Sequence, residues 1–222
     1  MGRRNEWLRP LILLAACLVL LPAGVRADAD RLGQVLEQIR QNSRANSSFR
    51  CRMVQVKRLK FFQEPVVFRG WIRSSRELGV RLDFSEPVPS SVIITAEKLI
   101  RCSEEGRAET YPLSGNQAAQ QIFQQVMTWF MFDTSALERR YSITLLDDSP
   151  TLEIIPADQA IRRYITGIRV RFGPEMNFPR SILIDEEGGD STEIILSECS
   201  SGIDFDSALF KECRLPASSL QR

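Results

Sequence analysis

The residue types that most enzyme chemistry needs are missing or scattered in this 222-residue chain. There is no histidine, which excludes a Ser-His-Asp or Cys-His nucleophile arrangement. There is also no G-x-S-x-G motif, no Gly-rich phosphate loop and no cluster of residues at metal-ligand spacing. The carboxylate pairs Asp147-Asp148 and Asp185-Glu186 lie beside predicted turns, where solvated charge is the ordinary explanation.

Two carboxylates alone suffice for a glycosidase, so this class of enzyme stays open on residue types, although no other feature supports it. The acidic stretch 186–190 has too few ligands at the right spacing for a calcium loop, and we interpret it as a hairpin turn. We therefore expect a protein that is not an enzyme, with no catalytic residues, no cofactor and no metal.

The first 27 residues have the features of a secretory signal peptide. Arginines at positions 3, 4 and 9 precede an apolar run at 11–21, and small residues suited to signal peptidase follow at Val25-Arg26-Ala27. The apolar run is shorter than the about 20 residues that span a bilayer. We predict cleavage after Ala27, which leaves a single domain at 28–222.

In a second interpretation, the signal peptide ends before a cysteine that anchors the protein to the membrane. Leu14-Ala15-Ala16-Cys17 fits the lipobox, in which the cysteine is lipidated and becomes the mature N-terminus. Ordinary cleavage is favoured because the residues after Cys17 stay apolar, where a lipoprotein normally has a polar tether.

The domain at 28–222 keeps four of the five cysteines: Cys51, Cys102, Cys199 and Cys213. An even number in an exported chain indicates two disulfides, with three possible pairings. Closeness in sequence favours Cys199 with Cys213, which leaves Cys51 with Cys102. The alternative is that some stay reduced and buried.

Charge argues against a nucleic-acid partner. The chain has 29 basic and 28 acidic residues, and the predicted signal removes four of the basic and one of the acidic ones. A near-neutral domain lacks the excess positive charge that binds the phosphates of a nucleic acid. Basic residues cluster on the first predicted strand, and we interpret them as a charged outer sheet face that resists edge pairing; they are Arg50, Arg52, Lys57, Arg58 and Lys60.

Hydrophobic periodicity predicts a mainly β fold with two substantial helices. One helix is predicted at 28–44, and another begins at the capping box of Ser114 and Gln117 and runs to about residue 132. A short helical turn is predicted at 134–139, and another at 203–211. Strict alternation predicts half-buried strands, with Arg81 and Asp83 on a polar face. The strands are predicted at 49–59, 66–73, 78–84, 91–95, 99–103, 108–112, 141–146, 151–155, 163–172, 180–184 and 191–196.

The apolar face of so long a sheet needs a cover, and only two helices are available. If the sheet curls and the helices lie across its mouth, side chains from both line the enclosed space. The candidates are Met53, Val80, Leu82, Phe84, Ile122, Phe123, Met127 and Phe130. Apolar burial stabilises either dense packing of these side chains or an enclosed acyl chain, and pattern alone favours packing.

The order of several residues resembles the LolA family of periplasmic lipoprotein carriers. Members of that family carry a strand with the pattern aromatic-x-Gln-x-Lys, followed by a Gly, an Arg and a polar residue before Pro. The same intervals are found here in Met53-x-Gln55-x-Lys57, Gly70, Arg76 and Glu86-Pro87. The resemblance covers roughly residues 30–215 and continues in the strand pair 91–94 and 99–100.

This resemblance implies an α+β, mainly β fold: an unclosed antiparallel β-barrel with a helical lid over an apolar cavity. It implies a monomeric periplasmic chaperone whose cavity takes up the acyl chains of a lipoprotein or another acylated lipid. The carrier would receive its cargo from an inner-membrane lipoprotein-releasing complex and pass it to an outer-membrane acceptor. Arg76 falls where the family has an arginine that holds the lid shut by hydrogen bonds to helix-end carbonyls.

The chain departs from the family pattern at Glu77, where Pro is usual, at Val80, where an aromatic is common, and at 96–98, which replaces an Asp-Gly turn. The resemblance therefore specifies the fold more firmly than the cargo. Two alternatives remain: a LolB-like acceptor anchored through Cys17, and a stress-sensing interaction module similar to RseB. We disfavour the second because those proteins carry an additional C-terminal domain.

Overall fold

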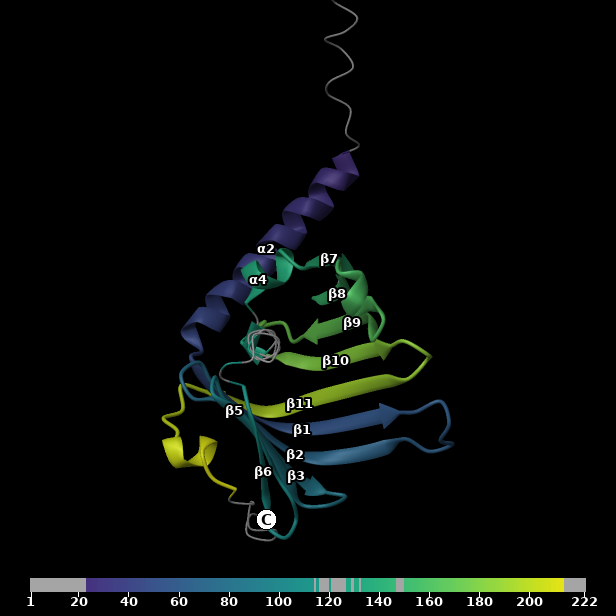
Figure 1. The fold of residues 1–222 in the computed structure, drawn as a ribbon. Coiled ribbons are helices and arrows are strands. Elements are labelled where there is room, and N and C mark those ends of the chain that lie inside the picture. Colours follow the sequence, from purple (N-terminus) through teal and green to yellow (C-terminus); the bar gives the residue numbers. More distant parts are fainter. Residues whose placement is uncertain are drawn as a thin grey trace, which may run out of the picture.

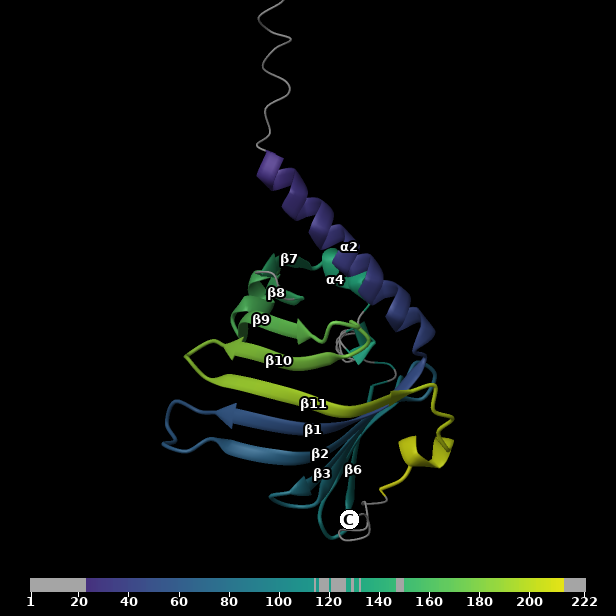
Figure 2. The same ribbon diagram turned by 180° about the vertical axis from the view of Figure 1, so that it is seen from behind.

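The protein is built on one large antiparallel sheet, with α2 (Ala23–Ala45) and α4 (Thr134–Glu138) against one face and the short 3-10 helix η3 (Ser207–Phe210) on the other (Figure 1; Figure 2). The computed structural model describes residues 23–113, 115, 120, 127, 128, 130, 131, 133–146 and 150–213. The strands are β1 (Ser48–Arg58), β2 (Val66–Ser75), β3 (Gly79–Glu86), β4 (Ser90–Ile94), β5 (Lys98–Cys102), β6 (Ala108–Pro112), β7 (Tyr141–Leu146), β8 (Thr151–Pro156), β9 (Ile165–Phe172), β10 (Pro179–Glu186) and β11 (Ser191–Ser201). Another short helix is α5 (Gln159–Arg162).

Two meanders meet in the middle of this sheet. The strand order is β6-β5-β4-β3-β2-β1-β11-β10-β9-β8-β7, so the first and last strands of the chain pair with each other. The two edges belong to β6 and β7, and the sheet does not close into a barrel. The predicted fold class, mainly β with an unclosed antiparallel sheet, is confirmed.

The strand predictions are confirmed throughout, with shifts at the ends. β9 begins at Ile165 rather than 163 because α5 and a short turn precede it, and β11 runs on to Ser201. The hairpin turn predicted at 186–190 is present, with positive φ angles at Gly188 and Gly189 that suit residues without a side chain. Alternating side chains were therefore a reliable guide to the sheet.

Helix α2 begins at Ala23, five residues before its predicted start, and packs its apolar stripe on the β7–β9 end of the sheet. Val35, Leu36 and Ile39 are buried there against Leu137 of α4 and the inner side chains of β7, β8 and β9. Asp133 caps α4 by accepting a hydrogen bond from the Ala136 backbone N–H at 3.1 Å. No helix in the described part of the chain is long and apolar enough to cross a membrane.

The mid-chain helix predicted from Ser114 lies largely outside the described residues. Met127, Thr128 and Phe130 are helical. Its predicted capping box, Ser114 and Gln117, is outside the described part, as are Ile122 and Phe123.

Gly70 lies where β2 and β3 approach too closely for a side chain. The register of this pair shifts between Arg69 and Gly70, and a Cβ atom on Gly70 would overlap the carbonyl oxygen of Asp83. The obstacle is backbone, which cannot move aside without disturbing the ladder. Gly33, by contrast, is exposed on α2 with open space around it.

We expect Gly70→Ala to lower the free energy of unfolding by about 2 kcal/mol, because the two strands must separate locally. Gly33→Ala is the matched control, and we expect it to raise stability by about 0.5–1 kcal/mol by removing backbone freedom within a helix. Urea denaturation measures both changes. A Gly70→Ala variant as stable as the parent would show that this close approach is not required.

Both disulfide pairs proposed from sequence closeness are wrong. The structure joins Cys51 to Cys199 and Cys102 to Cys213. Cys199 meets Cys51 because β11 lies beside β1, although the two are 148 residues apart in sequence. Cys213 meets Cys102 because the chain after β11 crosses back over the outer face of the sheet.

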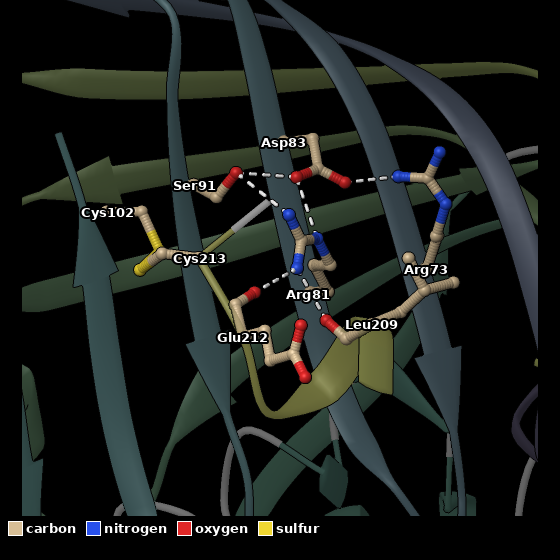
Figure 3. Close-up of polar contacts among 8 residues, drawn as sticks. All are labelled: Arg73, Arg81, Asp83, Ser91, Cys102, Leu209, Glu212 and Cys213. Atoms are coloured by element: carbon tan, nitrogen blue, oxygen red, sulfur yellow. Dashed lines mark hydrogen bonds and ion pairs between the residues drawn. A yellow bond between two sulfur atoms is a disulfide. The ribbon is translucent and has the colours of Figure 1, made fainter. Parts of the chain in front are cut away.

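We call residues 203–213 the strap. It carries η3 and packs Phe205, Leu209 and Phe210 on the outer-face residues Ile93 of β4 and Ile100 of β5. Figure 3 shows how the strap also covers the outer face of β3, next to the Cys102–Cys213 bond. The outer face of β3 to β5 is therefore a second buried layer rather than a solvated surface.

A charged cluster is buried beneath the strap. Arg81 of β3 donates from Nε to Asp83 at 2.8 Å and from Nη1 to the carbonyl oxygens of Leu209 and Glu212 (Figure 3). Asp83 also accepts from Arg73 and, at 2.6 Å, from the Ser91 hydroxyl. Arg81 and Asp83 do share the polar face predicted for this strand, but the strap buries that face, which alternation alone does not reveal.

Candidate functional site

An apolar cavity of about 80 Å³ lies on the inner, concave face of the sheet. Inner-face side chains of β1, β2, β3, β10 and β11 form its floor, and α2, the mid-chain segment and the loop before β10 form its other walls. The described residues that line it are Ile39, Ser43, Asn46, Phe49, Met53, Gln55, Ile72, Leu82, Phe130, Met131, Phe172, Asn177, Phe178, Pro179, Ile182, Ile194 and Leu196. None of them has an ionisable side chain, so this lining offers no group for acid–base catalysis.

The eight residues predicted to bind lipid fall into three groups. Met53, Leu82 and Phe130 line the cavity. Val80, Phe84 and Met127 belong to the apolar cluster around it but do not line it, and Val80 is fully buried. Ile122 and Phe123 lie outside the described residues. The six described residues thus lie in one apolar cluster, three of them on the cavity, and lipid binding by them stays a prediction.

Several lining residues were missed for different reasons. Phe49, Ile72, Ile194 and Leu196 occupy inner positions of β1, β2 and β11, and the same alternation that selected Met53 could have identified them. Phe178 lies in the irregular loop before β10, where no periodicity applies, and its ring packs 5.6 Å from that of Phe49.

The roof of the cavity consists of Ile39, Ser43 and Asn46 at the end of α2, together with Phe130 and Met131. The Ser43 hydroxyl donates a hydrogen bond to the carbonyl oxygen of Met131. One turn earlier, Arg40 donates from Nε to the Thr134 hydroxyl and from Nη2 to Glu138, both at 3.2 Å. These contacts fasten α2 to the segment that leads into α4.

Arg76 lies in the exposed turn between β2 and β3 and reaches the same part of α2. Its Nη2 donates to the carbonyl oxygen of Ser43 at 3.3 Å, and its backbone N–H donates to the carbonyl oxygen of Ser47 at 2.9 Å. The side chain therefore contacts a carbonyl near the C-terminal end of α2, whose last turn leaves carbonyl groups without partners inside the helix. We call Arg76, Ser43 and Met131 the latch.

Two of the four carboxylates considered for catalysis, Asp185 and Glu186, do not line the cavity. Asp185 accepts a hydrogen bond from Arg169 at 2.8 Å, and this bond and the carboxylate charge raise the pKa of Arg169. Glu186 accepts from the Thr192 hydroxyl at 2.7 Å. Asp147 and Asp148 lie outside the described residues. Asp185 and Glu186 thus have structural partners.

The cavity is too small for a lipid in this state. Pockets that hold small molecules have volumes of roughly 300–1,000 Å³, several times that of the present cavity. An acyl chain could enter only if the roof moved away from the floor. The site is therefore a small apolar cavity under a roof that is held by hydrogen bonds and by the buried side chains of Ile39 and Met131.

Three solved structures illustrate the resemblance in fold. An uncharacterised conserved protein from Thermus thermophilus is 9% identical with a TM-score of 0.49, and the match covers 84% of this chain and 95% of the other. The lipoprotein LppX of Mycobacterium tuberculosis is 9% identical with a TM-score of 0.45 and coverages of 78% and 99%. MucB in the Pseudomonas aeruginosa MucA/MucB complex is 16% identical with a TM-score of 0.44 and coverages of 79% and 59%.

Among curated proteins, none matches the chain. Residues 44–213, however, match the family described as "Outer membrane lipoprotein carrier protein LolA". This match extends from the end of α2 to the last residue of the strap, and so takes in all eleven strands, the cavity floor and the latch arginine. The chain belongs to the LolA family.

Proposed function

We propose that this protein is a periplasmic carrier that shields the acyl chains of a lipoprotein, or of another acylated lipid, in its apolar cavity. It would take the cargo from a releasing complex in the inner membrane and deliver it to an acceptor at the outer membrane. The observation that supports this most strongly is the apolar cavity on the concave face, whose described lining has no ionisable side chain and whose roof is joined to Arg76 and α4 by side-chain hydrogen bonds. The family match supports the same function.

The energies make opening by an acyl chain feasible. Among the described residues, four side-chain hydrogen bonds hold the roof and latch, and each contributes about 0.5–1.5 kcal/mol, or about 2–6 kcal/mol together. The buried side chains of Ile39 and Met131 add apolar contacts to the closed state. Burial of about ten methylene groups would contribute about 8 kcal/mol, at about 0.8 kcal/mol for each group. A bound acyl chain can therefore offset the loss of these hydrogen bonds and take the place of part of the apolar packing, whereas an empty cavity favours the closed roof.

The direct experiment is uptake of a fluorescent fatty acid by the purified protein in solution. We expect saturable binding at one site, displaced by unlabelled palmitate. Failure to bind any acyl ligand would favour a packed core and the interaction-module alternative. Mass spectrometry of the mature N-terminus distinguishes the carrier from the LolB-like alternative. A chain that begins at Asp28 has no lipid anchor, whereas one that begins at a diacylated Cys17 is attached to the membrane.

We expect Arg76→Leu to raise the affinity for fatty acid by about two- to tenfold, because the closed state loses a hydrogen bond of about 0.5–1.5 kcal/mol that the open state does not make. Fluorescence titration of the variant measures the change, and Arg76→Lys, which keeps a donor, is the control. Folding should be unaffected because the side chain is exposed. Equal affinities in wild type and Arg76→Leu would exclude a latch role for this residue.

A further inference from the structure

The exposed apolar side chains of this protein gather at one end of the sheet. The four most exposed large hydrophobic residues among those described are Phe61 at 94%, Tyr164 at 74%, Phe62 at 63% and Val88 at 51%. Single exposed hydrophobic residues are ordinary on a protein surface. Two adjacent exposed phenylalanines at a hairpin tip, with a third exposed aromatic residue in a neighbouring loop, form a group and indicate a contact surface.

The pairing register places all four in loops at the same strand ends. The β1–β2 loop follows the pair Lys57 and Val66, and the β3–β4 loop follows the pair Phe84 and Ser90. The pair Glu186 and Ile165 brings the start of β9, and with it Tyr164, to the β10–β11 turn. We call these loops, residues 59–65, 87–89, 163–164 and 187–190, the rim. Figure 1 and Figure 2 both show the β1–β2 and β10–β11 loops projecting side by side.

The rim is held together by backbone contacts rather than left loose. The Lys60 backbone N–H donates to Asp190 at 2.8 Å, and the Glu187 backbone N–H donates to the carbonyl oxygen of Tyr164 at 3.0 Å. The Phe62 backbone N–H closes the hairpin turn on the carbonyl oxygen of Leu59 at 2.9 Å. The aromatic loops are thus fixed relative to one another before any partner arrives.

Basic residues precede the rim aromatics in both loops. Exposed Lys60 comes directly before Phe61 and Phe62, and exposed Arg162 and Arg163 come directly before Tyr164. The rim also carries Glu64, Glu187 and Asp190, so it is the aromatic rings with their adjacent cations, and not a net positive charge, that fit a bilayer surface. Aromatic rings at the boundary between headgroups and acyl chains, with neighbouring cationic groups extended to the phosphates, are the typical anchors of proteins that lie on a bilayer.

The rim is also well placed for a carrier. Arg76 and the cavity roof lie at the opposite strand ends, since β2 begins at the rim with Val66 and ends beside the latch with Ser75. The cavity extends along β1 as far as Gln55, which is five residues, or roughly 17 Å of strand, before Lys60. Inner-face positions of β1, β10 and β11 connect the two ends.

We propose that the rim docks on a phospholipid bilayer, with Phe61, Phe62 and Tyr164 inserted at the interface and the strand ends opposite the latch turned toward the membrane. This inference rests on the proposed carrier function and deepens it, since it assigns the surface that meets the membrane while the roof opens at the other strand ends to exchange acyl chains. The contact is peripheral and reversible, and its partner is the lipid itself rather than a protein.

Co-sedimentation with vesicles of phosphatidylethanolamine and phosphatidylglycerol tests this directly. We expect the purified protein to bind, and Phe61→Ser with Phe62→Ser to reduce the partition coefficient at least tenfold, with a smaller loss for Tyr164→Ser. The matched control is Tyr111→Ser, which removes an aromatic ring that is 47% exposed on edge strand β6, away from the rim. As a second measurement, Phe61→Trp should give a blue-shifted emission when vesicles are added.

Absence of vesicle binding by the wild type, or equal loss in Tyr111→Ser, would overturn the proposal. Unchanged vesicle binding in the double variant, with loss only of transfer to a protein acceptor, would also overturn it and assign the rings to a protein pocket. Fatty-acid binding in solution tests the carrier function separately from the membrane contact, because the double variant should bind fatty acid with wild-type affinity when no vesicles are present. A wild type that binds vesicles through the rim but takes up no fatty acid would refute the carrier function and leave the membrane contact standing.

Discussion

Replacement of Asp83 by alanine will lower the free energy of unfolding by about 3–5 kcal/mol, a larger loss than the about 2 kcal/mol expected for Gly70→Ala. Asp83 is only 2% exposed and accepts hydrogen bonds from Arg73, Arg81 and Ser91. Its removal takes away the carboxylate that Arg81, which is equally buried, shares with Arg73. Loss of a carboxylate from a buried cluster of charges is far more costly than loss of a surface contact.

The pKa of Arg73 reflects its position in the same buried group of charged side chains. Burial lowers the pKa of this guanidinium, and the nearby charges of Arg81 and Arg50 lower it further, while Asp83 raises it. Asp83 is therefore the group that balances a locally positive environment. Loss of its charge would also weaken the attachment of the strap, because Arg81 holds the carbonyl oxygens of Leu209 and Glu212.

Two variants calibrate this prediction. Asp185→Ala breaks an ion pair of similar length, 2.8 Å to Arg169, in which both side chains are solvent-exposed, and should cost at most about 1 kcal/mol. Asp83→Asn keeps hydrogen-bonding capacity but loses the charge, and its cost should fall between the other two. Guanidinium chloride denaturation of all three proteins gives the comparison. If Asp83→Ala were no more harmful than Asp185→Ala, the buried cluster would contribute little to stability.

The largest functional effect should come from filling the cavity. Ile194 and Ile195 are neighbours on β11 and point to opposite faces of the sheet: Ile194 lines the cavity, and Ile195 is exposed on the outside. We expect Ile194→Trp to weaken fatty-acid binding at least tenfold, because the indole occupies the space that the acyl chain needs. A tenfold loss corresponds to about 1.4 kcal/mol of binding free energy.

The adjacent position supplies the control. Ile195→Trp places the same side chain on the same strand, one residue away and outside the cavity, and should leave fatty-acid affinity unchanged. Fluorescence titration of the two variants compares them directly, and their melting temperatures show whether Ile194→Trp remains folded. Equal affinities in the two variants would mean that acyl chains bind somewhere other than this cavity.

The sheet could be predicted from the sequence because alternation is a local property. Each strand carries its own pattern, and short connections favour antiparallel neighbours. The same pattern correctly selected Met53 and Leu82 as inner-face residues that line the cavity. Phe178 could not be found this way, because its position depends on how an irregular loop folds back on β1.

Long-range pairing was beyond the sequence pattern. The disulfide partners follow from the pairing of β11 with β1 and from the path of the strap over β5, and neither is encoded in the spacing of cysteines. For the same reason the sequence pattern placed Arg81 and Asp83 on a polar strand face but did not indicate that this face is buried. Alternation of polar and apolar residues shows that the two faces of a strand differ. It does not show which face is covered by a segment from a distant part of the chain.

The central claim is that the cavity on the concave face receives acyl chains. Native mass spectrometry of protein purified from a periplasmic extract without detergent tests it most directly, followed by the same measurement after denaturation. We predict a mass excess in the native state that is released on denaturation as an acylated lipid or lipoprotein, and a smaller bound fraction in Ile194→Trp than in Ile195→Trp. A clean apo mass, together with failure of the apo protein to take up fluorescent fatty acid, would contradict the claim and leave the cavity as a packing defect of the core.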